Sequence, residues 1–252
     1  MSATTWGAMR RHRVLLTAAV LFVLVGAAGC GSKAVVVYKT VTASPQASSS
    51  TGGNATAESS PEDLRLVESG WALAYGYVEY GVVLRNPNTA FAAVFPTIDI
   101  EMLGKGGQLI AVTDQVLNMA MAGQTIAWGG QADPNGKKPA KVNFSLSVRE
   151  SNWLSSDSPD YEPYEPFKIS GVNVGKDSLG SVVVTGRIKN PSSDSFESVA
   201  VSAILKGASG RVVAGFTGYV DNLGAHASKS FQVSSLGQLP AFKSVDVYAE
   251  RW

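Results

Sequence analysis

Two stretches of the sequence resemble each other, and they constrain the fold more than any other feature. Residues 76–88 read GYVEYGVVLRNPN, and residues 180–192, which lie 104 positions later, read GSVVVTGRIKNPS. Each run begins with glycine, alternates in polarity and ends at Asn-Pro. Because proline cannot donate a hydrogen bond to a sheet, Asn-Pro indicates the end of a strand. The sequence therefore predicts the same strand twice, in two copies of a longer unit.

Alternation within the two runs predicts which side chains face a core. In the first run the predicted inward residues are Val78, Tyr80, Val82 and Leu84. The predicted outward, solvated residues of that run are Tyr77, Glu79 and Arg85. In the second run the inward positions are Val182, Val184, Gly186 and Ile188.

Further strands are predicted after each run, in the same order. In the first copy, residues 98–102 form a hairpin with residues 109–112, residues 124–128 form another strand, and a hairpin turn at residues 133–136 leads into residues 142–148. In the second copy, residues 201–205 match 98–102, and Val245 and Val247 match Val142 and Phe144. Short strands without a long helical pattern predict an all-β fold of two tandem antiparallel immunoglobulin-like β-sandwiches.

The N-terminal region has the pattern of an exported protein. A basic segment, a 15-residue apolar run and small residues precede Cys30, which is the only cysteine. The predicted organisation is a signal peptide at 1–29, a lipidated cysteine and a Ser/Thr/Ala-rich tether at 30–61, a first sandwich at 62–155, an acidic, proline-rich linker at 156–165 and a second sandwich at 166–252. Proline in the linker predicts two domains held within a limited range of angles.

Three resemblances to known families support this organisation. The segment AAGC at residues 27–30 resembles the lipobox of bacterial lipoproteins, although Ala27 stands where leucine is usual. That resemblance implies acyl chains on Cys30 and an anchor on the extracytoplasmic face of the cell membrane; ordinary signal cleavage with a free thiol is the alternative. The runs VVLRNPN and IDIEML are similar to the WHy (type 2 late-embryogenesis-abundant) domain. The segments IEMLGKGGQLI and AILKGASGRVV are similar to the FxLYD module, without its Tyr-Asp pair. Both families imply β-sandwiches, and neither supplies catalytic residues.

Composition and residue content argue against several function classes. The formal net charge is +1, and removal of Arg10, Arg11 and Arg13 with the predicted leader leaves a net charge of −2 and no Lys/Arg cluster, so nucleic acid is not an expected partner. His226 is the one histidine outside the predicted leader, and it is predicted to lie in a solvated turn. Asp99 and Glu101 are predicted to share a solvated strand face, and the turn at residues 133–136 lacks the further acidic ligands of a calcium loop. We therefore expect no enzyme activity, no metal site and no cofactor.

Aromatic side chains are the remaining candidates for recognition, with core packing as the alternative. Tyr77, Trp153, Tyr161 and Tyr164 are the predicted partner-binding residues, and exposed sheet edges could accept a partner strand. The sequence thus predicts a non-enzymatic envelope lipoprotein that binds or organises an envelope protein or a cell-wall polymer. A solute-binding accessory lipoprotein and an envelope stress-protective protein are the alternatives, and an envelope hydrolase is not favoured.

Overall fold

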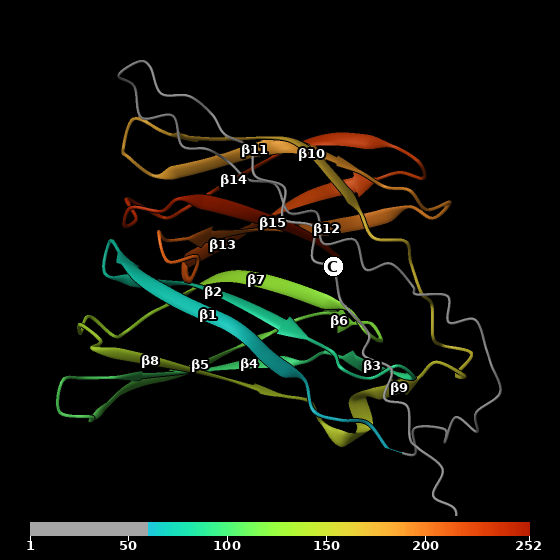
Figure 1. Ribbon diagram of the computed structural model, residues 1–252, viewed down its shortest axis with the longest axis horizontal. Helices are drawn as coiled ribbons and strands as arrows, with labels where there is room; N and C mark the ends of the chain where they lie inside the picture. Colours follow the sequence, from blue (N-terminus) through green and yellow to red (C-terminus); the bar gives the residue numbers. More distant parts are fainter. Residues whose placement is uncertain (1–59) are drawn as a thin grey trace, which may run out of the picture. The chain divides into compact units, whose positions relative to one another are not determined.

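Antiparallel strands form nearly all the regular structure of the computed structural model, which describes residues 60–252 (Figure 1). The predicted signal peptide, Cys30 and nearly all of the predicted tether lie outside the described residues. One short 3-10 helix, η1 (Glu150–Asn152), is the exception to the strands in the part of the chain that is described. The all-β prediction is confirmed.

Residues 60–155, here called the first half, form three antiparallel sheets. One sheet has the order β1 (Arg65–Ala74), β2 (Tyr77–Arg85), β7 (Thr125–Ala132). A second has the order β5 (Leu109–Val116), β4 (Thr97–Leu103), β8 (Lys141–Ser147). A short third sheet has the order β6 (Met119–Ala120), β3 (Phe91–Val94), β9 (Trp153–Ser155).

Residues 166–252, here called the second half, form two sheets. These have the orders β10 (Lys168–Lys176), β11 (Val182–Lys189), β14 (Ser228–Ser234) and β13 (Val212–Leu223), β12 (Phe196–Lys206), β15 (Ser244–Arg251). Each sheet draws its strands from one half, so strand pairing does not cross between the halves.

The internal repeat is visible in the strand register. Ile100 of β4 lies opposite Phe144 of β8, and Ala203 of β12 lies opposite Val247 of β15. Both long hairpins also have a register shift at the same place, after Met102 in the first half and after Leu205 in the second. The sequence match between the two copies is therefore a match of backbone register as well.

The asparagine of each Asn-Pro pair binds the backbone in the same way. The Nδ2 of Asn86 donates to the carbonyl oxygens of Phe91 and Ala120, at 2.8 and 3.0 Å. The Nδ2 of Asn190 donates to the carbonyl oxygens of Asp194 and Gly224, at 2.7 and 3.0 Å. Both side chains are fully buried, so each amide satisfies carbonyl groups that are shielded from water.

The first half uses a second buried asparagine to hold the chain where it enters the fold. Asn88 accepts a hydrogen bond from the backbone N–H of Glu62 at 2.6 Å and donates to the carbonyl oxygen of Glu62 at 2.8 Å. Its Nδ2 also donates to the Oδ1 of Asn86. Ser192 occupies this position in the second half, so the clamp on Glu62 is specific to the first copy.

His226 occupies a turn position that is glycine in the first half. His226 has a φ of 53° and Gly123 has a φ of 69°, and their N–H groups donate to the carbonyl oxygens of Ser192 and Asn88. The Nδ1 of His226 lies 2.9 Å from the carbonyl oxygen of Pro191. The solvated turn predicted for this histidine is confirmed.

Replacing His226 with glycine is expected to stabilise the protein by about 0.5–1 kcal/mol, because glycine adopts a left-handed conformation without the cost of a Cβ. The reciprocal change, Gly123→His, is expected to destabilise by about 1 kcal/mol. Urea denaturation of both variants measures the two effects. A loss of stability in His226→Gly would show that the ring contact with Pro191 outweighs the backbone strain.

Alternation predicted the inward side chains correctly. Val78, Tyr80, Val82 and Leu84 are at most 1% exposed and belong to the core of the first half. Val182, Val184 and Ile188 belong to the core of the second half. The solvated position predicted for Glu79 is wrong, since Glu79 is 0% exposed. Its face of β2 is covered by the second half.

Three glycines bring the two halves into direct backbone contact. Gly70, Gly81 and Gly129 lie side by side on β1, β2 and β7. A Cβ on Gly70 would lie 1.9 Å from the Val212 oxygen, one on Gly81 would lie 2.9 Å from the Ala214 oxygen, and one on Gly129 would lie 2.1 Å from the Phe216 nitrogen. Because Val212, Ala214 and Phe216 of β13 each meet a different strand of the β1-β2-β7 sheet, β13 crosses this sheet instead of running along one of its strands.

Small and apolar side chains complete this contact. Val83 and Ala127 from the first half form one buried cluster with Ile204 and Val212 from the second. Ala72 and Ala74 of β1 belong to the core of the second half, and Ala200 of β12 belongs to the core of the first. The halves therefore share their cores at this interface, and the relative position of the halves is set by packing as well as by the linker.

A tight turn is present at Asn135 and Gly136, as predicted, but it does not form a hairpin. Both residues have positive φ, 55° and 71°, as a type I′ turn requires. However, β7 pairs with β2 and β8 pairs with β4. The prediction of a hairpin is therefore wrong, because this tight turn carries the chain from one sheet to the other.

Candidate binding site

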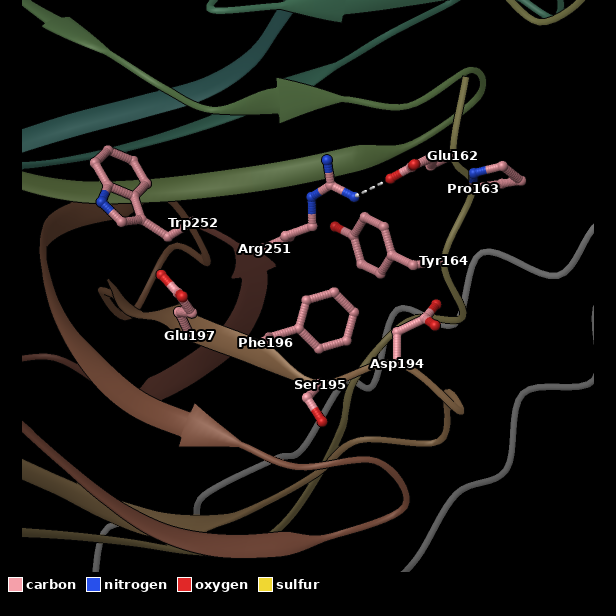
Figure 2. A pocket seen from close by; sticks show the side chains of 9 residues that line it. All are labelled: Glu162, Pro163, Tyr164, Asp194, Ser195, Phe196, Glu197, Arg251 and Trp252. Carbon is pink, nitrogen blue, oxygen red and sulfur yellow. Dashed lines mark ion pairs between the residues drawn. The ribbon is translucent and has the colours of Figure 1, made fainter. Parts of the chain in front are cut away.

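A pocket of 640 Å³ opens where residues 156–165, here called the connecting segment, meet the second half (Figure 2). Its walls come from three parts of the chain that are far apart in sequence. The connecting segment supplies Glu162, Pro163 and Tyr164, the start of β12 and the turn before it supply residues 194–197, and the end of the chain supplies Arg251 and Trp252.

Aromatic rings form the inner side of the pocket. Phe196 lies 5.0 Å from Phe167 and 6.0 Å from Tyr164, both in edge-to-face geometry. On the other side, Trp252 stacks on Trp128 of β7 with ring centroids 4.8 Å apart. Trp252 also contacts Tyr219, with ring centroids 5.6 Å apart, and is 41% exposed. Stacked and edge-to-face contacts of this kind hold the rings in fixed positions.

Charged side chains form the outer rim. Glu162, Asp194 and Glu197 are exposed, and Arg251 is the one cation that lines the pocket. Arg251 approaches Glu162 at 3.7 Å, a solvated ion pair worth well under about 1 kcal/mol. The rim therefore carries a negative balance and presents hydrogen-bond acceptors around the aromatic rings.

A buried carboxylate lies behind Tyr164. Glu250 accepts hydrogen bonds from the Tyr164 hydroxyl at 3.2 Å and from the Nε2 of Gln124 at 2.9 Å. Burial raises the pKa of Glu250 to about 8, although these two hydrogen bonds lower it in part. The same group thus links the first half, the connecting segment and the second half.

Glu79 is a second buried carboxylate between the halves. One of its oxygens accepts hydrogen bonds from the backbone N–H of Leu236 and from Gln131, while Oε2 is buried without a hydrogen-bond partner. Burial raises the pKa of Glu79 to about 7, again against the effect of its hydrogen bonds. Both carboxylates are therefore largely protonated in the folded protein below pH 7.

These two groups predict a stability that falls as the pH rises. Above about pH 4.5 the unfolded chain releases the two protons that the folded chain retains, so stability declines as the pH rises and levels off only above the folded-state pKa values of about 7 for Glu79 and about 8 for Glu250. Between pH 5 and 6.5 the expected slope is roughly 2–3 kcal/mol per pH unit for two protons. Glu250→Gln is expected to remove about half of that slope, as measured by urea denaturation at several pH values.

The exposed rim residue Glu197 supplies the matched control, because Glu197→Gln makes the same chemical change at the surface instead of in the interior. Its slope is expected to equal that of the wild type. Equal slopes for wild type and Glu250→Gln would show that Glu250 is already ionised in the folded protein at these pH values.

The four predicted partner-binding residues do not come together. Tyr77 is 42% exposed at the start of β2, and Trp153 is half-buried against the core of the first half. Tyr161 is half-buried in the connecting segment, whereas Tyr164 lines the pocket and bonds to Glu250. Partner binding at these four residues stays a prediction.

Sequence reasoning missed the other residues of this site. Phe196, Arg251 and Trp252 reach the pocket from strands that lie about 30 to 90 residues beyond the connecting segment, and no local motif marks them. The only available signal was the cluster of aromatic and acidic residues in the segment itself.

Other chemistry-bearing residues have structural partners. Asp99 accepts a hydrogen bond from Ser147 and Glu101 accepts one from Asn143, on the solvated face of the β5-β4-β8 sheet. Within residues 60–252, no three His, Cys, Asp or Glu side chains converge as metal ligands. The described part of the chain also has no helix that is long and apolar enough to cross a membrane.

Comparisons with known proteins place no family on the chain. No protein family model matches it, and no curated protein is significantly similar to it. Among solved structures, red sea bream transglutaminase is similar to 75% of this chain with 10% identity and a TM-score of 0.26. A glycoside hydrolase family 2 β-glucuronidase is similar to 75% with 15% identity and a TM-score of 0.25. The chain spans 31% and 24% of those two structures, respectively.

Proposed function

We propose that this protein is a non-enzymatic lipoprotein of the cell envelope, anchored by acyl chains on Cys30 and carrying tandem FxLYD-like or WHy-like sandwiches on the extracytoplasmic face of the membrane. In this role the folded part binds or organises an envelope protein or a cell-wall polymer. The pocket in Figure 2 is the observation that supports binding, because it combines the exposed ring of Trp252 with a rim of hydrogen-bonding groups.

The composition of the pocket favours recognition over chemistry. His226, the one histidine in the described part of the chain, lies in a different turn and contacts a backbone carbonyl. Aromatic faces suit sugar rings and cationic side chains, and the carboxylates around them suit hydroxyl or ammonium donors. A wall polymer or a basic peptide of an envelope protein satisfies both requirements.

Two observations support this proposal over solute capture. A solute-binding accessory lipoprotein requires a cleft at the junction of the halves, lined by Trp153 and the tyrosines of the connecting segment. The glycine row fills that junction with backbone, and Trp153 does not line the pocket. A stress-protective role rests on the WHy-like resemblance alone. Equal growth of a deletion strain and the wild-type strain under drying stress would contradict that role.

Photocrosslinking in living cells tests the binding role. A photoreactive amino acid at Glu197, on the rim, and at Tyr161, in the connecting segment, is expected to capture one recurring envelope protein or wall fragment, identified by mass spectrometry. Asn173, on the outer face of β10, is the control position. Capture of the same abundant neighbours from all three positions would contradict a specific partner at this pocket.

The anchor is tested separately. Metabolic labelling with an alkyne fatty acid is expected to label the wild type, and Cys30→Ala is expected to lose the label and to leave the membrane fraction. Retention of Cys30→Ala in the membrane without label would contradict lipid anchoring and would leave the binding role untouched.

A further inference from the structure

The repeat places the same hairpin in two different surroundings. In the first half, Gly104 N–H donates to Gln108 and Gly107 N–H donates to Gly104; in the second half, Gly207 N–H donates to Arg211 and Gly210 N–H donates to Gly207. The donor–acceptor distances agree, at 2.9 and 3.0 Å in both halves. Leu109 therefore occupies the position of Val212, and the two hairpins can be compared directly.

In the second half this hairpin binds a carboxylate. Glu68, from the extended strand β1, accepts a hydrogen bond from the backbone N–H of Val212 at 2.7 Å and one from the Nζ of Lys206 at 2.8 Å. One carboxylate is thus held by a backbone donor and an ammonium group together. Charge-assisted contacts of this kind are among the stronger hydrogen bonds in proteins.

In the first half the equivalent hairpin is open. A pocket of 660 Å³ lies beside it, lined by the apolar residues Leu109, Ile110 and Pro139 and by three lysines, Lys105, Lys137 and Lys138. All three lysines are exposed, and among the described residues none of them forms an ion pair. Leu109 is 56% exposed, whereas Val212 is buried under β1.

The charge has a different origin in the two hairpins. Leu103 stands at the position of Lys206, so the first half has no ammonium group on the strand itself. Its lysines come from the hairpin tip and from the turn between β7 and β8, and they surround the apolar lining. The open hairpin thus has three lysines around its apolar lining, and no carboxylate is among the residues that line this pocket.

We propose that the hairpin of the first half, with Lys105, Lys137 and Lys138, binds an extended acidic segment of another envelope protein. The glutamate of β1 that binds the hairpin of the second half is the structural precedent, since it comes from an extended strand. A purely charged polymer would use the lysines but not the apolar lining. An extended peptide that alternates acidic and apolar residues uses both.

The hairpin of the first half lies at the opposite end of β2 from Glu62. The chain enters the fold at Glu62, which binds Asn88, next to the end of β2 at Arg85. The turn that carries Lys137 and Lys138 follows Ala132, which pairs with Val78 at the opposite end of β2. The site is separate from the pocket in Figure 2, so the two proposals fail independently.

Binding of a short fluorescein-labelled peptide of alternating valine and glutamate to the full-length protein in detergent tests the proposal by fluorescence anisotropy. The triple variant Lys105→Ala, Lys137→Ala, Lys138→Ala is expected to weaken binding at least about tenfold, since each solvated contact contributes a few-fold. The matched control, Lys168→Ala, Lys176→Ala, Lys189→Ala, removes the same charge from exposed strand positions of the second half and is expected to stay within about twofold. Both variants are expected to keep the wild-type melting temperature.

Three outcomes would overturn the proposal. The first is no binding of the peptide by the wild type, or equal binding of a peptide with glutamine in place of glutamate. The second is an equal loss in the control variant, which would indicate net charge alone. The third is more effective displacement by inorganic polyphosphate: if it displaces the labelled peptide at a lower concentration of negative charges than the unlabelled peptide does, the lysines bind an anionic polymer instead.

Discussion

Gly129→Ala is expected to destabilise the protein by about 3 kcal/mol, an unusually large effect for the addition of one methyl group. The new Cβ would lie 2.1 Å from the backbone nitrogen of Phe216 and 2.4 Å from the carbonyl carbon of Gly215. Backbone atoms in a paired strand cannot rotate away, so β13 as a whole has to move and the contact between the halves is lost. Urea denaturation measures the change in the free energy of unfolding.

Gly175 in β10 provides the control for this substitution. It is also a strand glycine, but no heavy atom lies within 4 Å of its added Cβ. Gly175→Ala is therefore expected to be neutral or to stabilise slightly, through the reduced entropy of the unfolded chain. Equal effects at Gly129 and Gly175 would mean that the two halves do not pack through the glycine row.

Asn86→Ala and Asn190→Ala are each expected to cost about 3 kcal/mol. Each truncation leaves two carbonyl oxygens without their buried donor and one backbone N–H, of Asn88 or Ser192, without its acceptor. The cost arises from desolvated groups that lose their partners, because the side chain itself adds little apolar packing. Similar losses in the two variants would confirm that the asparagine of the Asn-Pro pair stabilises both copies through the same buried hydrogen bonds.

Asn173→Ala tests whether the loss is specific to burial. The Nδ2 of Asn173 donates to the carbonyl oxygen of Gly171 at the surface, where water can replace it. Its truncation is expected to change stability by less than about 0.5 kcal/mol. A small effect at Asn86 as well would indicate that water reaches the Phe91 and Ala120 carbonyls after truncation.

The sequence predicted the sandwich cores well because alternation and strand ends are local signals. Val82 and Leu84 were predicted to point inward because a strand with one apolar face buries that face, and they do so in the structure. The same rule failed for Glu79, since parity shows that a residue faces away from its own core but not whether another part of the chain covers it.

Gly81 was the overlooked signal for the buried interface. It lies one strand position from the inward residues Tyr80 and Val82, on the same face as Glu79, and its partners across the sheet are Gly70 and Gly129. The three glycines become a row only when the register of β1, β2 and β7 is known. A single sequence does not contain that register, so the interface could not be predicted from it.

The candidate pocket was predictable only in part, for a related reason. Tyr164 was predicted as a recognition residue and does line the pocket, but its partners Phe196 and Trp252 arrive through strand order. The sheet faces that the other half does not cover remain polar. Asp99 and Thr185 lie on such uncovered faces, whereas Gly81 and Ile204 lie on the covered faces.

The clamp between Glu62 and Asn88 has a mechanical consequence for a chain held by its N-terminus. A force applied through the preceding residues acts first on two hydrogen bonds to a buried asparagine and then on β1. That strand is joined to the second half through Glu68 and through the backbone contact of Gly70 with Val212. Tension applied through the residues before Glu62 is thus transmitted to both halves at once, so detaching β1 requires breaking the sheet and the interface together.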